Sequence, residues 1–187
     1  LDNDSFGTLN KVRLEGMAIE AILERYGRLF CEWDRAQISI CYAGYPKPSK
    51  QETPAAFSFR KNSFGAHVDG ILPIGNPKRR YAKEYHAFIF GIPLEDYNQF
   101  AAPVVVWEGS HRIIRTLLSR VLLQNGVEKW KNLDITQIYE EARKEALSKC
   151  KKKIIHVPLG GCYVLHRLAV HGIMPWKKRG NSEAESR

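Results

Sequence analysis

The chain has 187 residues and a mass of 21.4 kDa, which is enough for one domain with a real hydrophobic core and tight for two. Hydrophobic residues make up 44% of the chain and charged residues 26%, as in soluble globular proteins, and no apolar run approaches the ~20 residues of a membrane helix. The formal net charge of +9 favours an anionic partner, either a nucleic acid or a small substrate.

The first part of the chain predicts a helix followed by strands. Between Asn10 and Phe30, apolar residues recur at helical spacing with charged residues between them, so we expect an amphipathic helix. Residues 36–44 and 55–60 alternate apolar and polar side chains, which is the pattern of half-buried strands.

The rest of the chain predicts buried strands interrupted by two helices. Short apolar runs rich in β-branched and aromatic residues predict strands at 86–94, 102–107, 153–159 and 162–176. A turn at 108–112 leads into a helix over 113–122, which Gly126 would cap. A second helix is expected to start at Asp134 and to end among the cations at 149–153.

Many short strands joined by Gly/Pro turns predict a mainly β fold with helices, here a jelly-roll core with N-terminal and inserted helices. We expect a single domain over residues 1–187, with the helical insertion at about 112–152. The four cysteines form no CxxC pair and no secretory leader follows Leu1, so the cytoplasm is the expected compartment and no membrane partner is expected.

The basic residues gather in three stretches, at 78–80, 149–153 and 177–179. No aromatic platform for stacking bases is interleaved with them. This distribution favours solvated loop charge, or attraction of a small anionic substrate, over nucleic-acid binding.

The pair His67 and Asp69 is the strongest chemical signal in the sequence. The two residues are two positions apart, so on an extended backbone both side chains leave the same face and can converge on one ion. A third ligand from a distant strand would complete a set of two imidazoles and one carboxylate, which suits iron(II) and leaves coordination positions open. His171, followed by Gly172 at the end of an apolar run, is the best candidate for that ligand.

Three blocks in order, "AHVDG", "AAPVVVWEGSHR" and "VLHRLAVHG", resemble the phytanoyl-CoA dioxygenase family of iron(II)- and 2-oxoglutarate-dependent oxygenases. The similarity spans roughly 57–176. It implies a double-stranded β-helix, a cupin-like jelly roll, with a metal site at one mouth. It also implies that His67, Asp69 and His171 are the iron ligands and catalytic residues, and that 2-oxoglutarate and dioxygen are the cosubstrates of a hydroxylation.

The resemblance further implies a basic residue, usually arginine, that pairs with the distal carboxylate of 2-oxoglutarate. The expected position is about ten residues beyond His171, and Arg187 is our choice, with Arg179 and Lys177 as alternatives. A strand expected after such an arginine is missing from the sequence, which favours a truncated chain. The pattern selects neither a particular small organic substrate nor an oligomeric state.

Three other interpretations of the function stay open. The chain could be a non-catalytic jelly-roll binding protein with an incidental HxD pair, a cupin-type metalloenzyme that does not use 2-oxoglutarate, or a basic nucleic-acid binder with steeply salt-dependent affinity. Two further histidines are expected to be structural. His111 would hold the turn after its strand, and His166 would be buried and hydrogen-bonded.

Overall fold

The computed structural model describes residues 15–27, 33, 36–50 and 52–177. The chain divides into two compact units, residues 1–40 and 41–187, and each is described by itself. Our expectation of one oxygenase domain over the whole chain stays a prediction.

In the first unit, the amphipathic pattern forms helix α1, Met17–Tyr26, whose buried residues are Ile19, Ile22 and Leu23. The helix is shorter than the predicted 10–30. It starts after Gly16 and ends at Gly27, where a φ of 80° leaves the helical region. The outer parts of the predicted helix lie outside the described residues.

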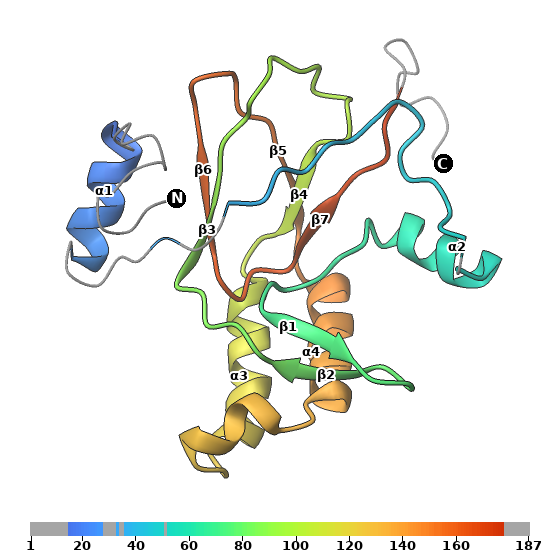
Figure 1. Cartoon of the computed structure of the whole chain (residues 1–187), viewed down its shortest axis with the longest axis vertical. Coiled ribbons are helices and arrows are strands. Elements are labelled where there is room, and N and C mark those ends of the chain that lie inside the picture. The colour runs from blue at the N-terminus through green and yellow to red at the C-terminus, as the bar shows by residue number, and fades with distance from the viewer. Residues whose placement is uncertain (1–14, 28–32, 34–35, 51, 178–187) are drawn as a thin grey trace. The chain divides into compact units, whose positions relative to one another are not determined.

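The second unit contains three small antiparallel sheets (Figure 1). A hairpin joins β1, Ile71–Ile74, to β2, Arg79–Ala82, and a second sheet pairs β3, Phe88–Gly91, with β6, Tyr163–His166. The third sheet has the order β5, Lys152–Ile155, then β4, Val104–Trp107, then β7, His171–Ile173. The predicted strands after residue 86 are therefore confirmed, with the run 162–176 divided into β6 and β7.

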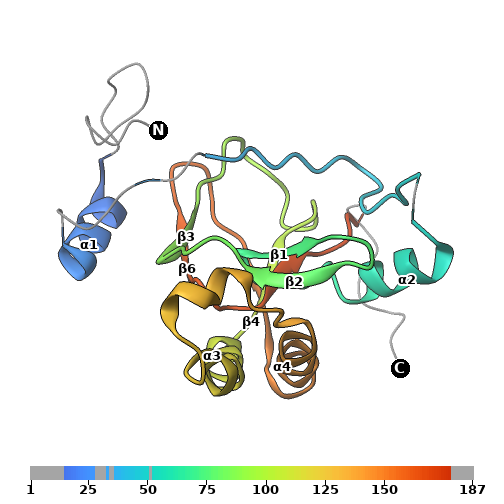
Figure 2. The same ribbon diagram turned by 60° about the horizontal axis from the view of Figure 1, so that its bottom comes forward.

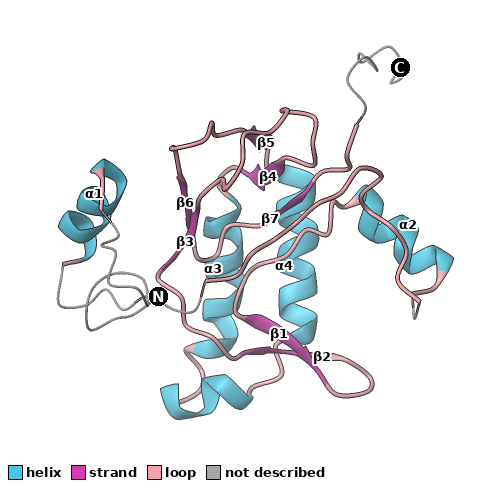
Figure 3. Ribbon diagram, turned by 45° about the horizontal axis from the view of Figure 1, so that its top comes forward, coloured by secondary structure: helices cyan, strands magenta, loops and turns pink. Residues whose placement is uncertain are grey.

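The prediction of a mainly β fold is wrong in its proportions. Helices account for 34% of the described residues and strands for 18%, so the protein is a mixed α/β structure of helices and antiparallel sheets (Figure 3). No helix within the described ranges has the length and apolar character needed to cross a membrane.

Two predicted strands are not strands. Residues 36–44 form no ladder, and the segment 55–60 lies inside helix α2, Pro54–Asn62. Local capping explains the helix, because Pro54 occupies its first turn and the Thr53 side chain accepts a hydrogen bond from the Ala56 N–H. The spacing of Phe57 and Phe59 predicts one face of a strand, but the capping residues determine the local structure and the segment is helical.

Helices are confirmed in the predicted range of about 112–152, whereas their being an insertion stays a prediction. They are α3, Ser110–Leu122, the 3₁₀ helix η2, Val127–Asn132, and α4, Thr136–Lys149. Gly126 does not cap α3 as predicted; it precedes η2. Helix α4 starts two residues later than predicted, and its N-cap is Ile135 and not Asp134. The Asp134 Oδ1 nevertheless accepts a 2.9 Å hydrogen bond from the N–H of Thr136, the first residue of the helix.

The main core lies where these helices meet the strands. Figure 2 shows α3 and α4 side by side beneath the β1–β2 hairpin. Trp107 of β4, Ile114 of α3 and Tyr139 of α4 are all buried in this core, together with Val68 and Val170, which are chain neighbours of His67, Asp69 and His171. The segments that carry those three polar residues are therefore anchored by the best-packed part of the unit.

Candidate metal centre

His67 and His171 lie opposite each other in an isolated antiparallel bridge. The His67 N–H donates to the His171 carbonyl at 2.9 Å, and the His171 N–H donates to the His67 carbonyl at 3.0 Å. A doubly bonded antiparallel pair presents both side chains on the same face. The two imidazole rings are accordingly neighbours, with centroids 4.5 Å apart.

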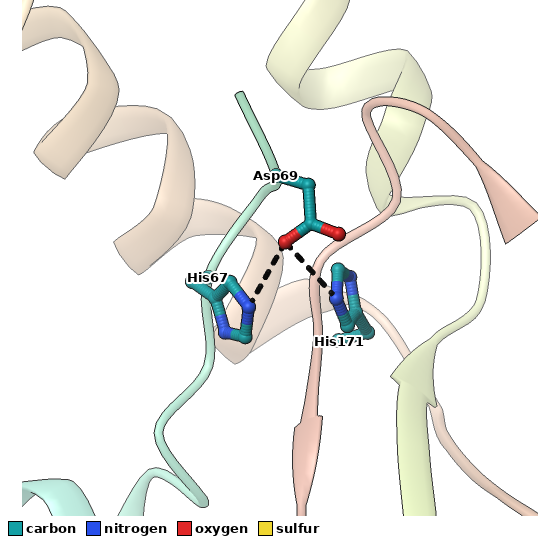
Figure 4. A group of neighbouring side chains, drawn as sticks. All are labelled: His67, Asp69 and His171. Carbon is teal, nitrogen blue, oxygen red and sulfur yellow. Dashed lines mark ion pairs between the residues drawn. The ribbon is translucent and has the colours of Figure 1, made fainter. Parts of the chain in front are cut away.

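Asp69 completes a compact group of three side chains (Figure 4). Its Oδ1 lies 3.1 Å from Nε2 of His67 and 3.6 Å from Nε2 of His171. The three potential ligand atoms all lie within 4.8 Å of one another. Ligands bound at about 2.1 Å to one ion lie roughly 3 to 3.5 Å apart. The two distances from Asp69 Oδ1 to the histidine Nε2 atoms are close to that range, so the three groups could hold one metal ion.

Both rings are held with Nε2 facing the carboxylate. Nδ1 of His67 lies 2.8 Å from the Gly65 carbonyl, and Nδ1 of His171 lies 3.0 Å from the Ala169 carbonyl. A carbonyl can only accept, so each Nδ1 carries its proton, and in the neutral ring the lone pair is on Nε2. This backbone arrangement is typical of histidines that bind a metal through Nε2.

The cluster is open on one side. The side chain of His67 is 49% exposed and that of Asp69 is 35% exposed, whereas the side chain of His171 is 11% exposed. A metal held by these three atoms would therefore be fixed against β7 and would keep coordination positions toward solvent or a substrate.

The ionisation of the cluster is shifted in a consistent way. The hydrogen bond between His67 and Asp69 raises the pKa of His67 and lowers the pKa of Asp69. Burial, followed by the positive charge of His67, lowers the pKa of His171. These directions favour an ionised Asp69 and a neutral His171, the forms that bind a cation, whereas His67 must lose the proton that Asp69 stabilises before its Nε2 can do so.

Helix α4 supports the segment that carries His67 and Asp69. Val68, between the two, is buried, and its N–H donates to the Tyr139 hydroxyl at 3.0 Å. The Arg143 guanidinium donates to the Ala66 carbonyl at 3.2 Å. Neither support was predicted from the sequence, because the pattern of this helix does not indicate which segment it contacts.

Ser110 supports the other side of the cluster. It is fully buried, and its hydroxyl accepts a 2.8 Å hydrogen bond from the N–H of Val170, the residue before His171. The Val170 carbonyl in turn accepts from the Trp107 N–H at 2.9 Å. The "GSH" and "AVHG" blocks of the sequence therefore meet in space through Ser110.

Two glycines allow the close approach of the backbones. A Cβ at Gly172 would lie 2.3 Å from the Phe64 carbonyl oxygen, and one at Gly70 would lie 2.4 Å from the Glu84 carbonyl oxygen. Gly70 also has a φ of 78°, a backbone conformation that residues with a side chain rarely adopt. Each glycine directly follows a residue of the cluster, so a larger side chain there would displace the adjacent polar residue.

None of the other candidate residues that the structure describes belongs to the cluster. Arg187 and Arg179 lie outside the described residues, and Lys177 is exposed. His111 stands in the first turn of α3 and not in a loop, and its ring neighbours that of His166 with centroids 4.7 Å apart. His166 is hydrogen-bonded as expected, through Nδ1 to the Leu168 N–H at 3.0 Å, but it is exposed and not buried.

Comparisons with family models, with curated proteins and with solved structures each found no match to this chain. The resemblance to the phytanoyl-CoA dioxygenase family therefore stays a prediction carried by three short blocks of residues. The geometry of the cluster is the independent observation on which a function can be argued.

Proposed function

We propose that the chain is a non-haem iron(II)- and 2-oxoglutarate-dependent dioxygenase, a hydroxylase of a small organic substrate. The observation that carries the proposal is the convergence of His67, Asp69 and His171 with both Nε2 atoms directed at one carboxylate oxygen. Two imidazoles and one carboxylate on one side of the ion form the ligand set used for iron(II) where open positions are needed.

The residues of the chain would act by binding and orientation. The two histidines would each offer the Nε2 lone pair that the Gly65 and Ala169 carbonyls leave free, and Asp69 would supply an oxygen ligand and one negative charge. Bound iron(II) would supply the chemistry by which dioxygen oxidises both 2-oxoglutarate, to succinate and carbon dioxide, and a substrate C–H bond, to a hydroxyl group, with one oxygen atom entering each product.

We also propose that the β3–β6 sheet and the β5–β4–β7 sheet belong to a double-stranded β-helix, the finer form of the predicted fold. From β3 the chain enters the other sheet at β4 and β5, returns to pair β6 with β3, and crosses again to place β7 beside β4. Such crossing between two facing sheets is the connection of a jelly roll. The bridge from His67 to β7 supports a further strand position beside β7.

For the cosubstrate we keep the proposal that Arg187 pairs with the distal carboxylate of 2-oxoglutarate, because a guanidinium matches a carboxylate with two hydrogen bonds. Replacing Arg187 with Ala should raise the 2-oxoglutarate requirement strongly. If Arg179→Ala does so instead, the assignment of the anchor is wrong.

Anaerobic titration with iron(II) and then 2-oxoglutarate tests the function directly. We expect one iron(II) per chain, and a metal-to-ligand charge-transfer band in the visible region once 2-oxoglutarate is added. Asp69→Ala should abolish the band, whereas Asp96→Ala, which removes an exposed carboxylate remote in sequence, should leave it unchanged.

The rival functions give different results in the same titration. A cupin-type metalloenzyme would bind a divalent metal at these residues and give no band with 2-oxoglutarate. A binding protein with an incidental HxD pair would bind no iron at all. Normal hydroxylation by the Asp69→Ala variant would show that the carboxylate ligand is misassigned.

A further inference from the structure

A second candidate site in this unit is lined by residues of α3 and of the β6–β7 turn, two segments that Figure 1 shows near each other. It is a cavity of about 270 Å³, close to the lower end of the ~300–1,000 Å³ typical of ligand pockets. The residues that line it come from α3, η2, the β1–β2 hairpin and the β6–β7 turn, and none of the three residues of the metal centre is among them.

The wall of this cavity is mostly apolar. Ile71, Leu118, Leu122 and Trp130 contribute side chains to it. The Trp130 indole N–H is already bonded to the Leu122 carbonyl at 2.8 Å, so its ring offers an apolar face. A ligand that fills the cavity must therefore have an apolar body.

The polar part of the wall is positively charged. Arg115 stands exposed on α3, Arg167 is half-buried in the β6–β7 turn, and His166 adjoins it. No Asp or Glu contributes to the lining, and among the described residues neither arginine takes part in an ion pair. Within the described part of the chain, no carboxylate therefore compensates the charges of the two guanidinium groups.

Arg167 is the lining residue that most strongly indicates an anionic ligand. Its Nε is buried without a hydrogen-bond partner, and its guanidinium carbon lies 5.9 Å from the centre of the Tyr85 ring. A buried donor without a partner is costly, and charged donors are the costliest. An anion that accepts from this group would remove that cost.

We propose that this cavity binds a small organic carboxylate whose apolar body occupies the space between α3 and Trp130. The carboxylate would accept two hydrogen bonds from Arg167, the geometry for which a guanidinium is suited. Arg115 stands where it adds positive charge at the mouth. The site does not depend on the metal centre, so it holds or fails separately from the dioxygenase proposal.

Calorimetric titration without added metal, using hexanoate as the probe, tests the site. We expect saturable binding of one hexanoate per chain. 1-Hexanol lacks the carboxylate and inorganic phosphate lacks the apolar body, so each should bind at least about tenfold more weakly. Arg167→Gln should weaken hexanoate binding at least about tenfold, since it removes a charge-assisted pair.

Two further variants control the result. Arg112→Gln removes an exposed cation from the same helix but outside the cavity lining, and it should leave hexanoate affinity unchanged. Ser119→Phe should block the cavity and abolish binding without touching the charges. No binding by the folded wild-type chain, equal binding of 1-hexanol or phosphate, or undiminished binding by either Arg167→Gln or Ser119→Phe would each overturn the proposal.

Discussion

His67 and His171 are fixed to each other by two backbone hydrogen bonds, of 2.9 and 3.0 Å, across an antiparallel bridge. The distance between their rings is thus set by main-chain geometry and not only by side-chain rotamers. Asp69 reaches the same point from two residues along the chain. Such a preformed ligand set loses little conformational entropy when a metal binds.

Replacing Gly172 with Ala should damage this bridge. The new Cβ would collide with the Phe64 carbonyl, which accepts the Ile173 N–H and holds the segment before His67 against β7. We expect the free energy of unfolding to fall by about 1–3 kcal/mol, as for other overpacked sites, and iron(II) affinity to fall with it. Urea denaturation and metal titration measure the two effects.

Gly126→Ala is the matched control for that substitution. The only side chain near a Cβ at this position is that of Glu128, which is exposed and can move away. We expect neither stability nor iron(II) affinity to change appreciably. Equal losses in the two variants would mean that glycine content, and not the Phe64 contact, sets the effect.

Tyr139→Phe should weaken the segment between His67 and Asp69. The substitution leaves the buried Val68 N–H without its acceptor, at a cost of about 1–3 kcal/mol. Tyr42→Phe removes a hydroxyl from a ring that is 71% exposed and should cost nothing measurable. Amide hydrogen exchange at Val68 should accelerate in the first variant alone, and unchanged protection there would contradict the support from α4.

Ser110→Ala should act on the other side of the cluster. Its hydroxyl is the acceptor of the Val170 N–H, so the loss again leaves a buried donor unpaired and should cost about 1–3 kcal/mol in thermal or urea unfolding. Ser58→Ala, at an exposed position of helix α2, is the control and should be neutral. A neutral Ser110→Ala would show that another group satisfies Val170.

The three members of the cluster could be predicted because each stands in a recognisable short pattern of the sequence. The HxD spacing directs two side chains to one face on an extended segment, and the apolar run before His171 predicts a strand. Their approach in space agrees with that expectation, whereas their role as iron ligands stays a prediction. The strands at 86–94, 102–107 and 153–159 were predictable for the same reason, since each is a compact apolar run.

The supports of the cluster were not predictable from spacing. Tyr139 and Arg143 lie in a helix about seventy residues beyond the segment they hold, and an amphipathic pattern does not reveal which strand a helix will touch. The segment 55–60 failed for a different reason, because capping by Thr53 and Pro54 determined the local structure more than two alternating phenylalanines did. The cavity near Arg167 depends on four elements and has no sequence signature.

The Asp69–His67 pair should give the centre a characteristic pH dependence. The hydrogen bond with Asp69 raises the pKa of His67, so its stabilising effect is complete below the ordinary histidine pKa and is lost as the pH rises through the raised value. The pKa of Asp69 is lowered, so its effect is present above the ordinary carboxyl pKa and is lost as the pH falls through the lowered value. Between these limits the metal-free pair is oppositely charged.

Asp69→Asn should therefore lower the pKa of His67, because it removes the largest cause of the increase. NMR titration of the His67 imidazole resonances in the wild-type and variant chains measures this directly. In the wild-type chain, iron(II) must displace the proton of His67, so its affinity should rise with pH until the pH passes the raised pKa. An iron(II) affinity that does not change across this range would mean that the metal binds without His67.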